Sequence, residues 1–158
     1  MGRDIHVRIV KRDHNTNEWK HIKLYKKEKG KFKFINPYPY RNYELFDILD
    51  GTEDEEYIPF KLNTKNLPIA LKSEIEKAIN TLGYYDFKEI NLADLKLYLK
   101  EVPKVRDWDY DEKDPQAFKD NPVKLFIEQI EYYLDFYDSD WDIMGSSSDI
   151  RILYWFDC

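Results

Sequence analysis

The chain has 158 residues, which suits a single domain that is long enough to bury a core without disulfides or metals. Hydrophobic residues make up 42% of it and only five residues are glycine, which argues against a disordered chain and against a glycine-rich phosphate-binding architecture. The net charge of −6 is uneven, because residues 1–50 carry +5 and residues 51–158 carry −11.

Alternating hydrophobicity predicts strands at the start of the chain. Ile5, Val7 and Ile9 share one face of the segment DIHVRIVKRD. The segment EWKHIKLYKK at 18–27 alternates again, and the turn-forming HNTN at 14–17 separates the two. We expect these segments to pair as a hairpin, and KFKFI at 31–35 to form a third short strand after the turn KEKG.

Helical spacing of apolar residues predicts four helices, at 41–51, 69–83, 91–101 and 121–138. Asn91 and Asn121 are the expected N-caps of the last two, and Pro122 suits a first helical position. The apolar stripe expected on the longest helix consists of Leu125, Phe126, Ile130, Tyr133 and Leu134.

The remaining segments complete an α+β pattern. YYDFKEI at 84–90 and IRILYWF at 150–156 are expected strands, whereas 103–122 and 139–149 are expected loops. The prediction is one domain over 1–158, in which the N-terminal hairpin and the C-terminal strand form an antiparallel sheet. Three to four helices are expected to pack mainly on one face of that sheet.

Four stretches of the chain carry a resemblance. MGRDIH at the start, YRNYELFDIL at 40–49, FKEINLADLKLYL at 87–99 and DIRILYWFD at 149–157 resemble a family of small phage-encoded and prophage-encoded proteins. Members open Met-Gly-x-Asp-Ile-His and end in an apolar strand closing Phe-Asp. The chain departs from them at Arg3, where Cys is common, and at 52–60, where a Gly/Arg-rich loop often follows the helix. The resemblance implies a phage origin rather than a particular chemistry.

A first candidate site lies at one end of the expected sheet. If the first and last strands are neighbours, Asp4, His6 and Asp157 approach one another there. A carboxylate–histidine–carboxylate cluster can bind a divalent metal or supply a general base. The simpler interpretation is a hydrogen-bonded network at the sheet end, since no second histidine pair at helical spacing supports a metal site. His14 lies in a turn, whereas His21 on the facing strand could lie near His6.

A second candidate lies at the start of the helix at 41–51. Free N–H groups at a helix N-terminus favour anions, and Arg41 with Asn42 there would suit a phosphate. The alternative is structural. In it Asn42 caps the helix, Tyr43 packs in the core and Arg41 pairs with an acidic neighbour.

The acidic-aromatic segments DWDYDEKD at 107–114 and YYLDFYDSDWD at 132–142 are the third candidate. Spaced carboxylates can imitate the phosphates of nucleic acid, and exposed aromatic residues anchor protein interfaces. Burial of the tryptophans is the alternative. The expected partner-binding residues are Asp107, Trp108, Asp109, Tyr110, Asp111, Asp138, Asp140, Trp141 and Asp142.

Lysines interleaved with aromatic residues at 20–34 are the fourth candidate. Such strands can hold single-stranded nucleic acid, although lysines on an exposed strand more often prevent edge-to-edge aggregation. The residues concerned are Lys20, Lys23, Lys26, Lys27, Lys29, Lys31 and Lys33, with Tyr25, Phe32 and Phe34.

The location and the class of function follow from what the sequence lacks. A single cysteine, Cys158, cannot form an internal disulfide, and neither a signal-peptide pattern nor an apolar run of 18 residues occurs, so we expect a cytoplasmic protein. The sequence has no nucleophile elbow, Walker loop, paired Cys-x-x-Cys or dinucleotide fingerprint. These absences favour a binding protein without a cofactor over an enzyme.

The sequence therefore predicts a phage accessory protein in the host bacterial cytoplasm that binds and inhibits a host component. A defence nuclease or immune effector is the expected target, as for anti-CRISPR proteins, and the acidic-aromatic half would cover its basic surface. Direct binding of nucleic acid carries less weight, and no membrane partner is expected. The alternative is a small metal-dependent hydrolase or nucleotide-binding protein that uses Asp4, His6, Arg41 and Asp157.

Overall fold

The computed structural model describes residues 3–22, 24–50, 73, 88–107, 117–137 and 146–157. Within these residues the fold is α+β, with three helices and an antiparallel sheet of four strands. The helices are α1 (Tyr43–Asp50), α3 (Leu92–Glu101) and α4 (Val123–Tyr137). The strands are β1 (Asp4–Arg12), β2 (Trp19–Ile22), β3 (Tyr25–Glu28), β4 (Lys31–Phe34), β5 (Lys88–Asn91), β6 (Lys104–Arg106), β7 (Phe118–Asp120) and β8 (Ile150–Asp157), with a 3-10 turn η1 (Ser147–Asp149) before the last.

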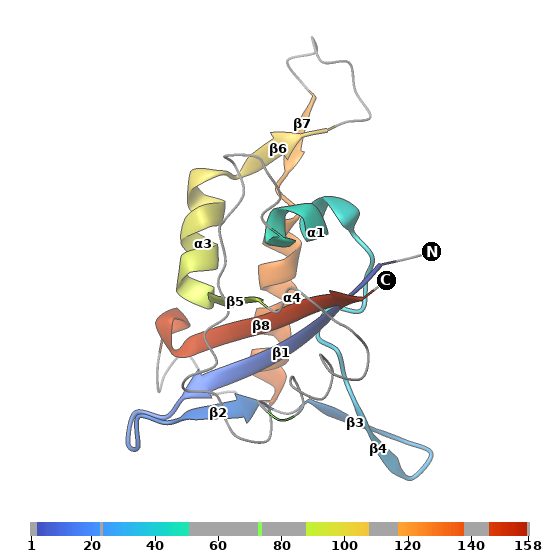
Figure 1. Ribbon diagram of the computed structural model, residues 1–158, viewed down its shortest axis with the longest axis vertical. Coiled ribbons are helices and arrows are strands. Elements are labelled where there is room, and N and C mark those ends of the chain that lie inside the picture. Colours follow the sequence, from blue (N-terminus) through green and yellow to red (C-terminus); the bar gives the residue numbers. More distant parts are fainter. Residues whose placement is uncertain are drawn as a thin grey trace.

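The main sheet has the order β2-β1-β8-β5, and every neighbouring pair is antiparallel. The first and last strands lie side by side at its centre, with Asp4 opposite Asp157 and Lys11 opposite Ile150 (Figure 1). This pairing confirms the predicted sheet, built from the N-terminal hairpin and the C-terminal strand. Two separate hairpins, β3–β4 and β6–β7, extend toward opposite ends of the molecule (Figure 1).

One face of the sheet forms the core with the three helices. Alternate residues of β1 and β8 are buried there against apolar residues of α1, α3 and α4. The contributing side chains include Ile5, Val7 and Ile9 from β1, Ile152, Tyr154 and Phe156 from β8, Leu45, Phe46 and Leu49 from α1, Leu92 and Leu95 from α3, and Phe126, Ile130 and Leu134 from α4. Packing of the described helices against one face is what the sequence pattern predicted.

The opposite face of the sheet is lined by arginines stacked on aromatic rings. Arg8 lies 4.9 Å from the ring of Trp155, and His6 stacks on the same indole at 5.3 Å. Farther along the sheet, Arg151 lies 4.9 Å from the ring of Trp19 and forms an ion pair with Glu89. Trp155 and Arg151 are both buried, so these stacks stabilise the second face of the sheet.

The predicted strand at 18–27 is divided in the structure. Trp19–Ile22 pairs with β1, whereas Tyr25–Glu28 pairs with β4 and leaves the main sheet. Between them Leu24 is buried in the core, and its carbonyl accepts a hydrogen bond from the N–H of Ile35. The sequence predicted one continuous strand because polar and apolar residues alternate in both halves of the segment. In the structure the buried Leu24 lies between the half that pairs with β1 and the half that pairs with β4.

Two predicted loops contain regular structure. The segment 103–122 includes the short strands β6 and β7, which pair from Lys104–Asp120 to Arg106–Phe118. The second, at 139–149, ends in η1, where Ser146 and Asp149 form a reciprocal capping box. Strands of three residues are too short to give a periodic signal, whereas Ser-x-x-Asp at 146–149 is a capping pattern that the loop prediction passed over.

Both predicted asparagine caps are confirmed. The Oδ1 of Asn91 accepts from the N–H of Ala93 at 2.9 Å, and the Oδ1 of Asn121 accepts from the N–H of Val123 at 3.0 Å. The helix expected at 69–83 and the strand residues at 84–87 lie outside the described residues, apart from the helical Ser73. No helix in the described ranges combines the length and apolarity that crossing a membrane requires.

Candidate functional site

The outward side of α4 carries an exposed stripe of apolar and acidic side chains. Leu125, Tyr132 and Phe136 are 53%, 60% and 71% exposed, and the exposed Glu128 and Asp135 lie among them. Spacings of three, four and seven residues place all five on one side of the helix. We call these five residues the α4 outer face.

Leu125 corrects one sequence prediction. It was assigned to the buried stripe of this helix, but the stripe facing the core consists of Val123, Phe126, Ile127, Ile130 and Leu134. Leu125 directly precedes Phe126, and the rotation of about 100° between neighbouring residues of a helix places it outside the buried stripe. The adjacent apolar pair Leu-Phe made the buried stripe look wider than it is.

A cluster of phenol rings extends the α4 outer face at its C-terminal end. Tyr133 lies 5.3 Å from the ring of Tyr132 and 6.3 Å from that of Tyr137, and Tyr137 lies 4.9 Å from the ring of Phe136. Burial, followed by the neighbouring phenols of Tyr40, Tyr132 and Tyr137, raises the pKa of Tyr133. Its hydroxyl is protonated at neutral pH, as an unperturbed phenol also is, and can donate a hydrogen bond.

Of the nine predicted partner-binding residues, the structure describes Asp107. It follows β6, its N–H donates to the carbonyl of Ala117 at 2.6 Å, and its carboxylate lies 3.8 Å from Lys119. Lys119 also binds Glu44 of α1 at 2.8 Å, which ties this hairpin to the helix. Trp108, Asp109, Tyr110, Asp111, Asp138, Asp140, Trp141 and Asp142 lie outside the described residues.

At the sheet end, Asp4 is bound by Arg41. The Nε and Nη2 atoms of Arg41 donate to the two carboxylate oxygens at 2.6 and 3.3 Å, and this hydrogen bonding lowers the pKa of Asp4. The register places Asp157 opposite Asp4, and the ring of His6 stacks on that of Trp155. Within the described ranges, no three histidine, cysteine, aspartate or glutamate residues form a group suited to a metal.

The start of α1 matches the structural alternative in two of three respects. Asn42 accepts from the N–H of Leu45 at 3.1 Å and so caps the helix, and Arg41 pairs with an acidic neighbour, Asp4. Tyr43, expected in the core, is 51% exposed, and its hydroxyl accepts a hydrogen bond from the N–H of Arg3. The predicted hydrolase residues Asp4, His6, Arg41 and Asp157 thus share a sheet end where Arg41 already neutralises one carboxylate.

The structure adds a cluster that sequence reasoning did not assemble, centred on the buried Asp149. Its carboxylate accepts from Arg12 Nε and from the N–H of Ser146, both at 2.9 Å, and lies 2.9 Å from His14 Nε2. Burial alone would raise the pKa of Asp149, but the hydrogen bonds from Ser146 and Arg12 outweigh it and lower the pKa. These contacts join the β1–β2 turn to the start of β8, which is a structural role.

Comparisons of the chain with protein-family models, with curated proteins and with solved structures find no match.

Proposed function

We propose that this chain is a phage accessory protein that acts in the host bacterial cytoplasm by binding and inhibiting a host component. The target class is a defence nuclease or another immune effector, and inhibition is by occlusion of its basic, nucleic-acid-handling surface. The observation that carries the proposal is the α4 outer face, an exposed acidic-aromatic surface on a helix whose other side is buried in the core.

The composition of the α4 outer face supports a protein partner. Tyr132 and Phe136 supply large rings that lose little conformational entropy on binding, as hot-spot residues do. Glu128 and Asp135 supply negative charge beside them, which would steer the protein toward a basic patch. The chain continues directly into the acidic residues 138–142, so the acidic-aromatic character does not stop at the end of the helix.

The phage origin and the anti-defence target rest on the resemblance of four motifs to phage-encoded proteins, together with the acidic balance of residues 51–158. A protein that covers a nucleic-acid-binding surface needs negative charge in the places where that surface meets phosphates. The proposal predicts competition, since the target should release nucleic acid when it binds this protein.

The test is an affinity pull-down from nuclease-treated bacterial lysate with three forms of the tagged chain. The wild type is expected to capture one host protein in near-equal amount, and Tyr132→Ala/Phe136→Ala is expected to lose it. The control Tyr43→Ala/Leu97→Ala removes two other side chains that are about half exposed, and should capture as the wild type does. Capture should weaken with added salt, and the purified target should bind its nucleic acid less tightly in the presence of the wild type.

Three results would contradict the proposal. Equal capture by the wild type and by Tyr132→Ala/Phe136→Ala would remove the α4 outer face from the mechanism. Charge reversal of Asp109 and Asp111 that leaves the affinity unchanged would mean that the acidic segment at 107–114 does not contribute to target binding. A captured protein whose nucleic-acid binding is unaffected would exclude occlusion.

A further inference from the structure

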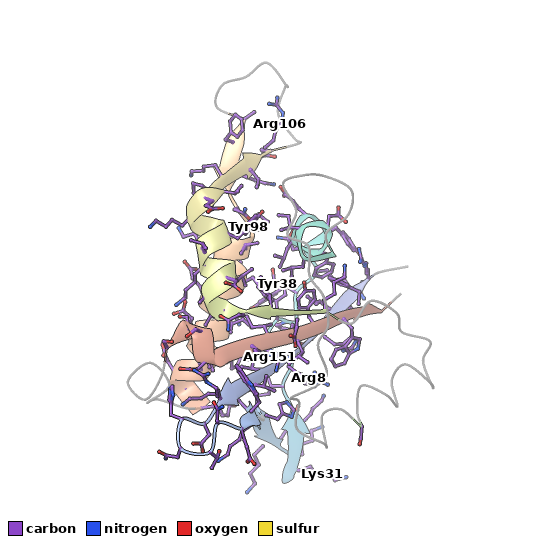
Figure 2. All side chains as sticks on the ribbon, turned by 60° about the vertical axis from the view of Figure 1, so that its left-hand side comes forward. Arg8, Lys31, Tyr38, Tyr98, Arg106 and Arg151 are labelled. Carbon is purple, nitrogen blue, oxygen red and sulfur yellow. The ribbon has the colours of Figure 1, made fainter. Side chains whose placement is uncertain are left out.

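The β3–β4 hairpin concentrates positive charge in a protein that is acidic as a whole. Residues 25–34 contain five lysines and one glutamate, a local charge of +4 in a chain of net charge −6. Lys27, Lys29, Lys31 and Lys33 are all exposed. We call this hairpin the lysine ribbon, and Figure 2 places its residue Lys31 at the end of the molecule opposite Arg106.

The backbone of the lysine ribbon is well defined by its turn and register. Lys29 and Gly30 have φ angles of 51° and 77°, and positive φ at both central positions is the signature of a two-residue hairpin turn that suits twisted strands. Lys26 pairs with Lys33 and Glu28 with Lys31, so these four positions share one face. The other face holds positions 25, 27, 32 and 34, of which three are aromatic residues.

The lysines of the ribbon differ from other lysines of the described chain. Lys20, Lys104 and Lys119 each hold a carboxylate within 3 Å. Among the described residues, no ion pair involves the four exposed lysines of the ribbon. Lys31 and Lys33 lie two positions apart on the same face of β4, so their like charges repel one another. A polyanion bound to the ribbon would relieve that repulsion.

We propose that the lysine ribbon binds single-stranded nucleic acid through its phosphates. Lys31 and Lys33 are two residues apart, or about 6.8 Å along the strand, so both can reach phosphates of one bound strand. The four exposed lysines lie within one ten-residue hairpin, and a flexible single strand can bend around its end to reach the lysines of both faces.

The test is fluorescence anisotropy with a labelled 20-nucleotide oligothymidylate at several salt concentrations. Four phosphate contacts predict a slope of about −3 for log K against log salt, from about −0.7 per contact. Lys27→Gln/Lys31→Gln/Lys33→Gln should reduce the slope to about −0.7 and weaken binding at least tenfold at low salt. Lys29 is left in place because it forms the turn.

The matched control is Lys100→Gln/Lys104→Gln/Lys124→Gln, which removes the same charge from exposed lysines elsewhere and should bind within twofold of the wild type. Equal loss in both triple variants would show a general charge effect and overturn the proposal, as would a wild type that does not bind the oligonucleotide at low salt. Binding to vesicles of anionic phospholipid without binding to the oligonucleotide would also overturn it, in favour of a lipid surface. The Tyr132→Ala/Phe136→Ala variant should bind the oligonucleotide normally, so this proposal and the proposed function can fail separately.

Discussion

The α4 outer face and the lysine ribbon carry opposite charges and are supported by the fold in opposite ways. Behind the α4 outer face, Phe126, Ile130 and Leu134 are fully buried against the sheet. The lysine ribbon stands outside the four-stranded sheet as two four-residue strands closed by a turn. The α4 outer face is therefore as stable as the core behind it. The lysine ribbon depends on its own local structure, because a two-stranded hairpin is only marginally stable by itself.

Replacing Phe126 by Ala should have the largest effect on stability. The ring is fully buried and lies 5.3 Å from the ring of Tyr38, so its loss leaves a cavity and should lower the free energy of unfolding by about 3–5 kcal/mol. Phe136→Ala, ten residues along the same helix, should change it by less than about 0.5 kcal/mol. Urea denaturation followed by circular dichroism measures both. Similar losses in the two variants would mean that the two sides of α4 are not as different as their burial indicates.

Asp149→Asn should have the next largest effect and should spare both surfaces. It replaces a buried carboxylate that binds Arg12, His14 and the N–H of Ser146, which should lower the free energy of unfolding by about 1.5–3 kcal/mol. The folded protein should retain an intact α4 outer face and lysine ribbon, because neither contributes to this cluster. Loss of oligonucleotide binding by the folded variant would show that the ribbon depends on the main sheet after all.

The contribution of Asp149 should also depend on pH. Its pKa in the folded protein lies below the ordinary value of 3.8, so the charged form is favoured by folding. This stabilisation is complete above the unfolded value and is lost as the pH falls through the lower, folded value. The difference in stability between the wild type and Asp149→Asn should therefore be present at pH 5 and shrink below about pH 4. A difference that stays unchanged down to pH 2 would contradict the assignment.

Asn121→Ala tests the anchorage of α4 at its first turn. The buried Asn121 accepts from Val123 N–H and donates to Tyr98 Oη and the carbonyl of Val102, so its loss should lower the free energy of unfolding by about 1–2 kcal/mol. Asn121→Asp keeps the capping oxygen and should recover part of the loss. No recovery would mean that the bonds to Tyr98 and Val102, rather than the cap, carry the effect.

Gly30→Ala should have the smallest effect, confined to the lysine ribbon. A Cβ at Gly30 meets nothing within 4 Å, so the change acts through the φ angle of 77°, at about 1 kcal/mol. Hydrogen exchange of the ribbon amides should accelerate about fivefold while the free energy of global unfolding stays within about 0.5 kcal/mol. Gly30→Asn tolerates this conformation and should exchange nearly as the wild type does. Equal acceleration in the main sheet would show that the ribbon is not an independent unit.

The sequence predicted the fold better than it predicted the candidate sites. Alternation in β1 and β8 and the caps Asn91 and Asn121 are local signals that reflect burial directly, and the structure confirms them. The partition of the run at 18–27 between two sheets depends on the distant residues that pair with it, which alternation does not reveal.

The candidate sites depended on contacts between residues far apart in the chain. The Asp4–Arg41 pair was anticipated only as one alternative, and the Arg12–Asp149 contact spans 137 residues without any sequence pattern to mark it. Leu125 was misplaced because its neighbour Phe126 belongs to the buried stripe. Its exposure is what widens the α4 outer face beyond the acidic-aromatic segment that the sequence indicated.

The pairing of β1 with β8 has a consequence for the order of folding. The two central strands are the first and last in sequence, so the sheet cannot form until residues 139 to 153 positions apart have met, and such non-local pairing is slow. Hairpins such as the lysine ribbon close in about 1–10 μs. In a newly made chain the lysine ribbon should therefore form while the two central strands are still apart. A nucleic acid could then bind the ribbon before α4 packs against the sheet.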